Sequence, residues 1–275
     1  MSLESQITAL VSAANNLTSE VAGKMAGIDQ KVDQATASIP DAIKRESYKD
    51  FYVDSIYGDD DNEGTQSAPL KTIREASDRS LNLSVVDVRL MGGQIFETDF
   101  PSSCARVRFT TYNMGLGKAK MYPFAEVQDA DSFRLRGLHS NGNFQTVVFS
   151  GVDVHCEVFP EETGVGGRSV NQFSSNFIFG DQGRDVYLYN SDVYVKDISF
   201  TGIHSGYASR SLSIGASTIY RVNGTSIPLV NSRTARNPVM TLSVQSAVLD
   251  GWSAWGETLP ADTGGGNILA NIDLF

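Results

Sequence analysis

The side chains of this sequence that could do acid–base chemistry are carboxylates scattered along its middle. Glycosidases place two carboxylates on either side of the bond that they cleave, so a well-spaced pair would predict an enzyme. Asp129 and Asp131 would share one face of a strand, which is an ordinary arrangement for a solvated surface. The other candidates have no spacing that pairs them, and they are Glu126, Asp153, Glu157, Asp181, Asp185, Asp192 and Asp197. The sequence therefore predicts no catalytic residue.

Histidine and cysteine, which serve as metal ligands and nucleophiles, are few and separated. His139, His155 and His204 form no zinc-binding spacing. His155 precedes Cys156, but neighbouring residues of a strand point to opposite faces, which argues against a nucleophile pair. Cys104 and Cys156 form no CxxC motif and are expected to be free or buried thiols. We predict no cofactor and no metal site from these residues.

An acidic loop at residues 58–65 is a weaker candidate for metal binding. Asp59, Asp61 and Glu63 alternate and precede Gly64, loosely like a calcium-binding loop. No helix is expected before this loop, and its fifth position departs from the calcium pattern. A solvated turn is therefore the favoured interpretation.

Aromatic side chains offer a second kind of chemistry, because an exposed ring can stack on the apolar face of a sugar. We predict five glycan contacts in the β-rich part of the chain: Tyr187, Tyr189, Tyr207, Trp252 and Trp255. The alternative is that these rings pack in the interior or at an interface between chains. Residue type alone does not choose between the two.

The elements that would position these side chains are short strands. Residues 85–250 contain alternating apolar pairs, which predict strands with one buried face: Val107 and Phe109, Phe133 and Leu135, Val186 and Leu188, Val193 and Val195, and Ile198 and Phe200. Gly and Asn punctuate the strands. The pattern indicates a mostly β fold, either a solenoid of parallel strands or an antiparallel β-sandwich or jelly roll. Residues 251–275 end in apolar side chains, which we expect to be buried in an interface at the tip.

Residues 1–40 show the heptad repeat of an α-helical coiled coil. Its apolar stripe consists of Leu3, Ile7, Leu10, Ala14, Leu17, Val21, Met25, Ile28, Val32, Ala35 and Ile39. A step of four residues between Val21 and Met25 is a stutter in the repeat. The narrow stripe favours a coiled coil over an amphipathic helix packed on its own domain, but the mixed core residues do not decide between two and three strands. Pro40 is expected to end the helix.

The junction at residues 41–84 carries the most specific motif. We expect a strand at residues 51–56, a polar loop, and a helix that starts at Pro69 and buries Leu70, Ile73 and Ala76. The motif resembles the start of the pectate-lyase-like right-handed β-helix in tail fibre and tailspike proteins of tailed bacteriophages. The matching residues are Tyr52, Val53, Asp54, Gly58, Asp59, Asp60, Asn62, Gly64, Thr65, Pro69, Leu70, Lys71, Thr72, Ile73 and Ala76.

The resemblance implies a fold and a set of partners. It implies a trimeric coiled-coil stalk followed by a right-handed parallel β-helix, whose open end is capped by Val53, Asp54, Pro69, Leu70, Ile73 and Ala76. It implies a homotrimer in the virion, made in the host cytoplasm, that joins other phage tail proteins through its N-terminal end. The partner would be a bacterial surface polysaccharide such as lipopolysaccharide. A polysaccharide-degrading tailspike and a purely structural tail component are the alternatives.

The composition argues against two other classes of partner. The formal net charge is -10, so the average field of the protein repels the phosphates of nucleic acids and anionic membrane surfaces. No stretch of 18 or more apolar residues is present, so we expect no membrane insertion.

Overall fold

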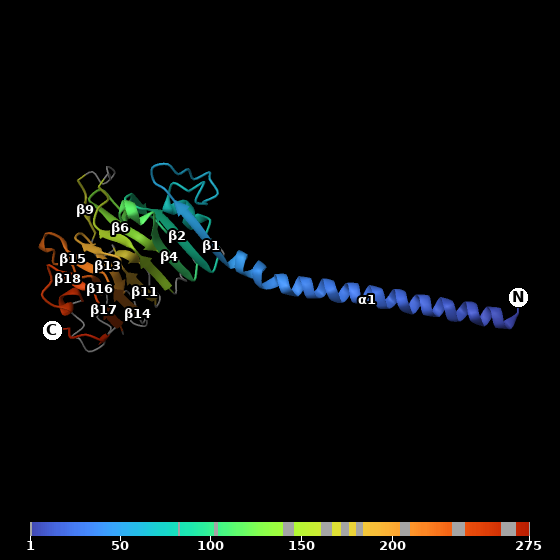
Figure 1. Cartoon of the computed structure of the whole chain (residues 1–275). Helices are drawn as coiled ribbons and strands as arrows, with labels where there is room; N and C mark the ends of the chain where they lie inside the picture. Colours follow the sequence, from blue (N-terminus) through green and yellow to red (C-terminus); the bar gives the residue numbers. More distant parts are fainter. Residues whose placement is uncertain are drawn as a thin grey trace. The chain divides into compact units, whose positions relative to one another are not determined.

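The computed structural model describes residues 2–81, 83–101, 104–139, 146–160, 167–171, 176–179, 184–203, 210–232, 240–259 and 268–274. The chain divides into two compact units, Met1–Ser47 and Tyr48–Phe275. The first unit is one helix and the second is built mainly from strands (Figure 1). The mostly β character and the long N-terminal helix that the sequence predicted are therefore confirmed.

Helix α1 runs from Leu3 to Ser47 without interruption (Figure 1). The prediction that Pro40 ends the helix is wrong, because helical backbone continues for seven residues beyond it. A proline removes only one N–H donor from the ladder of hydrogen bonds, so a helix can continue past it at an energetic cost. The helical unit Met1–Ser47 is thus longer than the predicted 1–40 and ends where strand β1 begins.

The junction folds as a strand, a long loop and a short helix, with shifted boundaries. Strand β1 is Tyr48–Val53, earlier than the predicted 51–56. Helix α2 is Ile73–Asp78, so Pro69 lies before the helix and not in its first turn. Thr72 is the N-cap, because its side chain accepts a hydrogen bond from the backbone N–H of Glu75. This cap, which suits threonine, explains why the helix starts later than predicted.

Of the predicted cap residues, Pro69 is partly exposed, and the others are buried. Leu70, Ile73 and Ala76 belong to the apolar core, and Leu70 forms an isolated parallel bridge with Val53. The buried Asp54 carboxylate accepts hydrogen bonds from the backbone N–H groups of Ile56 and Tyr57 and from the side-chain amide of Gln94.

One sheet of the body is parallel throughout and takes one strand from each successive stretch of chain. Its order is β1-β2-β4-β7-β11-β14-β17-β19. Every neighbouring pair is parallel. The strands after β1 are β2 (Val85–Met91), β4 (Arg106–Tyr112), β7 (Thr146–Ser150), β11 (Arg184–Tyr189), β14 (Arg210–Gly215), β17 (Met240–Gln245) and β19 (Ile268–Ala270).

A second, mixed sheet alternates with the first along the chain. Its order is β16-β13-β10-β6-β5-β8-β12-β15-β18, with β3 paired to β5 and β9 paired to β6. Its pairs are parallel except for β5 with β6. Its strands are β3 (Ile95–Thr98), β5 (Ala119–Val127), β6 (Ser132–His139), β8 (Val152–Cys156), β9 (Ser169–Val170), β10 (Asn176–Phe179), β12 (Val193–Val195), β13 (Ser199–Ile203), β15 (Thr218–Arg221), β16 (Val230–Ser232) and β18 (Val248–Asp250).

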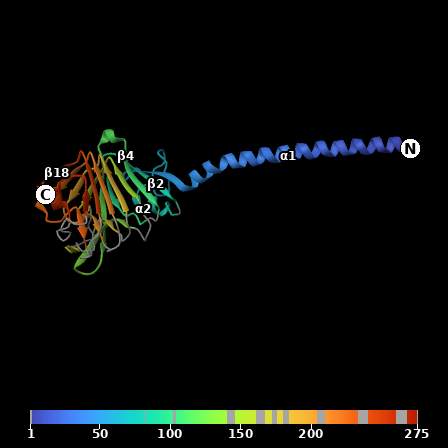
Figure 2. The same cartoon turned by 90° about the horizontal axis from the view of Figure 1, so that it is seen from below.

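The parallel pairing decides one question that the sequence left open. An antiparallel sandwich or jelly roll would pair neighbouring strands in opposite directions, so this alternative is wrong. Figures 1 and 2 show strands of successive stretches of chain side by side, from β1 and α2 at one end of the body to the C-terminal segment at the other. Short 3-10 helices lie at Met114–Leu116, Val222–Gly224 and Trp255–Thr258.

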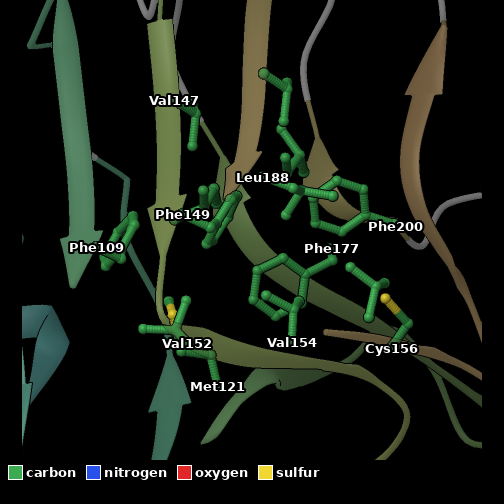
Figure 3. Close-up of a cluster of buried hydrophobic side chains, with 14 of the residues drawn as sticks. Phe109, Met121, Val147, Phe149, Val152, Val154, Cys156, Phe177, Leu188 and Phe200 are labelled. Atoms are coloured by element: carbon green, nitrogen blue, oxygen red, sulfur yellow. The ribbon is translucent and has the colours of Figure 1, made fainter. Parts of the chain in front are cut away.

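The core lies between the sheets and is aromatic in its middle. Residues of neighbouring parallel strands align in register, so that Phe109 of β4 faces Phe149 of β7, which faces Leu188 of β11. Phe177 and Phe200 reach the same cluster from the other sheet (Figure 3). The ten residues of the five predicted apolar pairs are all buried, which confirms the predicted alternation.

The apolar C-terminal segment packs on its own chain. Strand β19 pairs with β17, and Ile268, Ile272 and Leu274 lie partly buried against the core. The N–H of Gly256 donates to the carbonyl of Leu274. The expected burial of this segment in an interface between chains stays a prediction, and Leu269 is 69% exposed.

The corners that follow strands of the parallel sheet share a left-handed backbone. A residue with positive φ follows each of β2, β4, β7, β11, β14 and β17, and these residues are Gly93, Asn113, Gly151, Asn190, Ala216 and Ser246. Glycine and asparagine adopt this conformation readily, whereas alanine is strained there because its Cβ crowds the backbone. The Gly and Asn punctuation of the sequence marks several of these corners.

Ala216, with φ of 49°, leads to a prediction about stability. Ala216→Gly should raise the free energy of unfolding by about 0.5–1 kcal/mol, because relief of strain exceeds the extra entropy that glycine loses on folding. Urea unfolding should show a higher midpoint. Ala247→Gly is the matched control, since Ala247 has no positive φ and packs on the core, and it should be destabilising by about 1 kcal/mol. Equal losses in both variants would contradict the strain at Ala216.

Candidate functional site

The apolar stripe of α1 contains many of the exposed large apolar side chains of the described residues. Leu10 is 71% exposed and Leu17 is 63% exposed. The other described stripe residues are exposed too: Leu3, Ile7, Ala14, Val21, Met25, Ile28, Val32 and Ala35. The side chain of Ile39 lies outside the described residues. A stripe of this kind is stable in water only when another surface covers it, so α1 is a candidate interface.

A second candidate surface is the outward face of β11, where two of the predicted glycan contacts lie. Tyr187 is 40% exposed and Tyr189 is 63% exposed. In register beside Tyr187 lie Val148 and Ser213, and beside Tyr189 lie Ser150 and Gly215. A Cβ atom at Gly215 would lie 3.5 Å from the Tyr189 ring, so the ring lies against the next strand. Two exposed rings with hydroxyl groups beside them can contact both the apolar face and the hydroxyls of a sugar.

The two tryptophans do not belong to this surface. Trp252 is only 9% exposed, and the guanidinium carbon of Arg221 lies 4.9 Å from its ring centroid. Because a cation already covers the ring, the prediction that Trp252 stacks on a sugar is wrong. Trp255 is partly buried, and its side chain packs against the core of its own chain. Tyr207 lies outside the described residues.

An aromatic ladder on the second sheet was missed by the sequence analysis. The rings of Tyr122, His155, Tyr194 and Tyr220 stack with centroids 4.4, 4.3 and 4.6 Å apart. They come from β5, β8, β12 and β15, which pair in parallel. Stacked rings hide their faces from solvent, so the ladder holds the register of these strands. Its residues are separated by unequal intervals in the sequence, and only the strand pairing reveals it.

The carboxylates flanking this ladder are held in ion pairs. Lys118 contacts Asp192 at 2.8 Å and Asp153 at 3.5 Å, and burial raises the pKa of Asp153. Glu157 is bound by His155 at 3.1 Å and by Lys196 at 2.8 Å. The His155 hydrogen bond, together with the Lys196 ammonium, lowers the pKa of Glu157.

Several other acidic candidates also have structural partners, and the Asp197 carboxylate accepts a hydrogen bond from the backbone N–H of Val158. Glu126 pairs with Arg134 and Arg136, and Asp129 caps a turn by accepting the N–H groups of Asp131 and Ser132. Asp181 lies outside the described residues. These contacts assign the carboxylates to holding strands and turns in place.

The thiol and metal candidates give no reactive centre in the described part of the chain. Cys156 is fully buried and burial raises the pKa of its thiol well above the ordinary value, whereas the His155 ring joins the outward ladder, as opposite faces of a strand require. Cys104 is buried too, and His204 lies outside the described residues. Among the described residues, no group of three His, Cys, Asp or Glu side chains is placed so that it could hold a metal ion.

The acidic loop is tied into the junction by hydrogen bonds. The Asp60 carboxylate accepts from the N–H groups of Lys71 and Thr72 and from the Thr72 hydroxyl, each at 2.9 Å. The Asp59 carboxylate accepts from the N–H of Asp61. These contacts orient the loop over the start of α2.

A cavity of about 730 Å³ lies between α2, β3 and β5. Its walls include Ile56, Ile95, Phe96, Phe124 and Phe159, and its polar groups include Lys71, Arg74, Glu97 and Asp99. A mostly apolar pocket with a few polar groups is the usual form of a small-molecule site. No local pattern in the sequence indicates this cavity, because its lining comes from segments between Ser55 and Phe159 that are separated along the chain.

No family model matches the chain, and no curated protein matches it. A similar solved structure is that of a GH136 lacto-N-biosidase from Eubacterium ramulus, with a TM-score of 0.40 and 14% sequence identity over 73% of this chain. The chain spans 41% of the length of that protein. Within the described residues, no helix is both long enough and apolar enough to cross a membrane.

Proposed function

We propose that the chain is a homotrimeric tail fibre of a tailed bacteriophage, which attaches the virion to a bacterial surface glycan such as lipopolysaccharide. The observation that carries the proposal is the exposed heptad stripe of α1. The a and d spacing of the stripe is typical of helices that associate in a coiled coil. We therefore propose that the α1 helices of two further copies cover the stripe. The number three follows from the phage-like motif at residues 48–80.

We propose further that the body is a capped right-handed parallel β-helix. Along the chain, strands of the parallel sheet alternate with strands of the second sheet. A solenoid of stacked repeats has this order of strands. Crossover connections between parallel strands are nearly always right-handed. In this arrangement Val53, Leu70, Ile73 and Ala76 would cover the open end of the core, which otherwise exposes apolar side chains.

Attachment would work through several weak sites. Each copy would present Tyr187 and Tyr189, and a trimer would present them three times, so that avidity replaces tight single contacts. The N-terminal end of α1 would join other tail proteins. The ion pairs of Asp153, Glu157 and Asp192 favour attachment over cleavage of the glycan.

The test is attachment of the full chain, fluorescently labelled, to a panel of bacterial strains. We expect binding to at least one strain, competition by lipopolysaccharide or capsule purified from it, and about tenfold weaker binding by Tyr189→Ala. Val248→Ala, which also shortens an exposed apolar side chain but on β18, is the control and should bind as the wild type does. Absence of binding across the panel, or release of new reducing ends from the polysaccharide, would contradict the proposal.

A further inference from the structure

The cavity between α2, β3 and β5 points to a second ligand site, away from the exposed tyrosines of β11. We propose that it binds a short oligosaccharide segment of the surface glycan. This inference rests on the proposed function and deepens it.

The apolar wall is fixed in place before any ligand arrives. Phe96 is buried, and Phe124 and Phe159 are partly exposed into the cavity. The Phe159 ring meets Tyr122 edge to face, with centroids 5.7 Å apart, and Tyr122 in turn stacks on His155. A ring held in this way loses little conformational entropy on binding, which favours affinity.

The polar groups of the rim are also oriented. The Arg74 guanidinium is held by Asp99 at 2.6 Å and by Asp78 at 3.1 Å. The Gln94 side-chain oxygen accepts from the N–H and hydroxyl of Ser55, and its amide donates to Asp54. Lys71 is exposed, and Glu97 lies in register beside Tyr122 of the ladder. The rim therefore offers both donors and acceptors beside an aromatic wall.

This combination fits a saccharide better than other small ligands. A sugar ring has apolar C–H faces and a rim of hydroxyl groups, which need both donors and acceptors. A phosphate compound would meet the carboxylates of Glu97 and Asp99 in a protein of net charge -10, which opposes binding. An acyl chain would leave the charged groups of the rim without solvent, which is costly.

The experiment measures binding of the full chain to an array of purified bacterial surface oligosaccharides. We expect the wild type to bind some of them. The isosteric Glu97→Gln should bind the same ones at least about tenfold more weakly, which is the loss expected for one hydrogen bond to a charged group. Phe159→Ala should also bind them about tenfold more weakly, because the aromatic wall is lost. Val127→Ala is the control, since Val127 is exposed at the far end of the same strand as Phe124 and does not line the cavity. Thermal melting checks that each variant is folded.

The outcomes separate this inference from the proposed function. Equal binding by Glu97→Gln, Phe159→Ala and the wild type would overturn the cavity as a saccharide site, while attachment to cells that depends on Tyr189 would leave the proposed function standing. Absence of array binding by the wild type would overturn the inference as well. Failure of the wild type to attach to any strain would overturn the proposed function itself.

Discussion

Substitution of Leu10 by aspartate is expected to convert the proposed trimer into single chains. Leu10 occupies a d position of the heptad repeat and is 71% exposed in one copy, so three copies would bury it in one layer of the seam. Aspartate at this position would bring three carboxylates together without a partner, at a cost of several kcal/mol for each buried charge. Such a cost is large compared with the stability of a short coiled coil.

The measurement is light scattering after size exclusion at micromolar concentration. The wild type should give three times the 29.8 kDa of one chain, and Leu10→Asp should give the mass of one. Leu17→Asp lies one heptad further along and should have the same effect. The helical signal in circular dichroism should also fall, because a single helix without a partner is only marginally stable in water.

Ser12→Asp is the matched control. Ser12 is two residues from Leu10, so it projects from nearly the opposite side of the helix, where a charge remains in water. This variant should keep the wild-type mass. A wild-type particle with the mass of one chain, or an unchanged mass for Leu10→Asp and Leu17→Asp, would show that the stripe does not join copies.

The core could be predicted from the sequence because burial follows strand periodicity. Val107 and Phe109 alternate with polar neighbours, and both are buried in β4. The direction of pairing could not be predicted in this way, because alternation is the same in parallel and antiparallel sheets. Gly and Asn predict only some of the corners, since alanine at position 216 gives no indication of a left-handed backbone.

The candidate sites depended on contacts that no local pattern contains. Trp252 was predicted to stack on a sugar, but the guanidinium of Arg221, which is far from it along the chain, lies over its ring. The exposure of Tyr187 and Tyr189 could be predicted, because two residues at alternate positions of a strand share a face. The apolar Val186 and Leu188 mark the other face as buried. The cavity beside α2 could not be predicted, because three elements form it only in the folded chain. The predicted helix end at Pro40 was wrong, because the loss of one hydrogen-bond donor does not outweigh the stability of the rest of the helix.

Removal of the Phe149 ring is expected to have the largest effect on the stability of the body. Phe149 is fully buried, stacks on Phe109 with centroids 5.6 Å apart, and meets Phe200 and Phe177 at 5.7 and 6.1 Å (Figure 3). Phe149→Ala should lower the free energy of unfolding by about 3–5 kcal/mol, because apolar contacts are lost and a cavity remains. Each lost aromatic pair adds to this cost. A loss of this size is a large fraction of the stability of most domains.

Urea unfolding followed by circular dichroism measures the loss, and two variants of the same strand show whether it comes from the core. Val148→Ala changes the outward neighbour, which lies beside Tyr187, and should cost less than 1 kcal/mol. Phe149→Leu keeps most of the apolar volume and should lie between the two. If Phe149→Ala were as stable as Val148→Ala, the register that places Phe149 between Phe109 and Leu188 would be incorrect. The parallel order of β4, β7 and β11, from which the proposed solenoid follows, would then be incorrect as well.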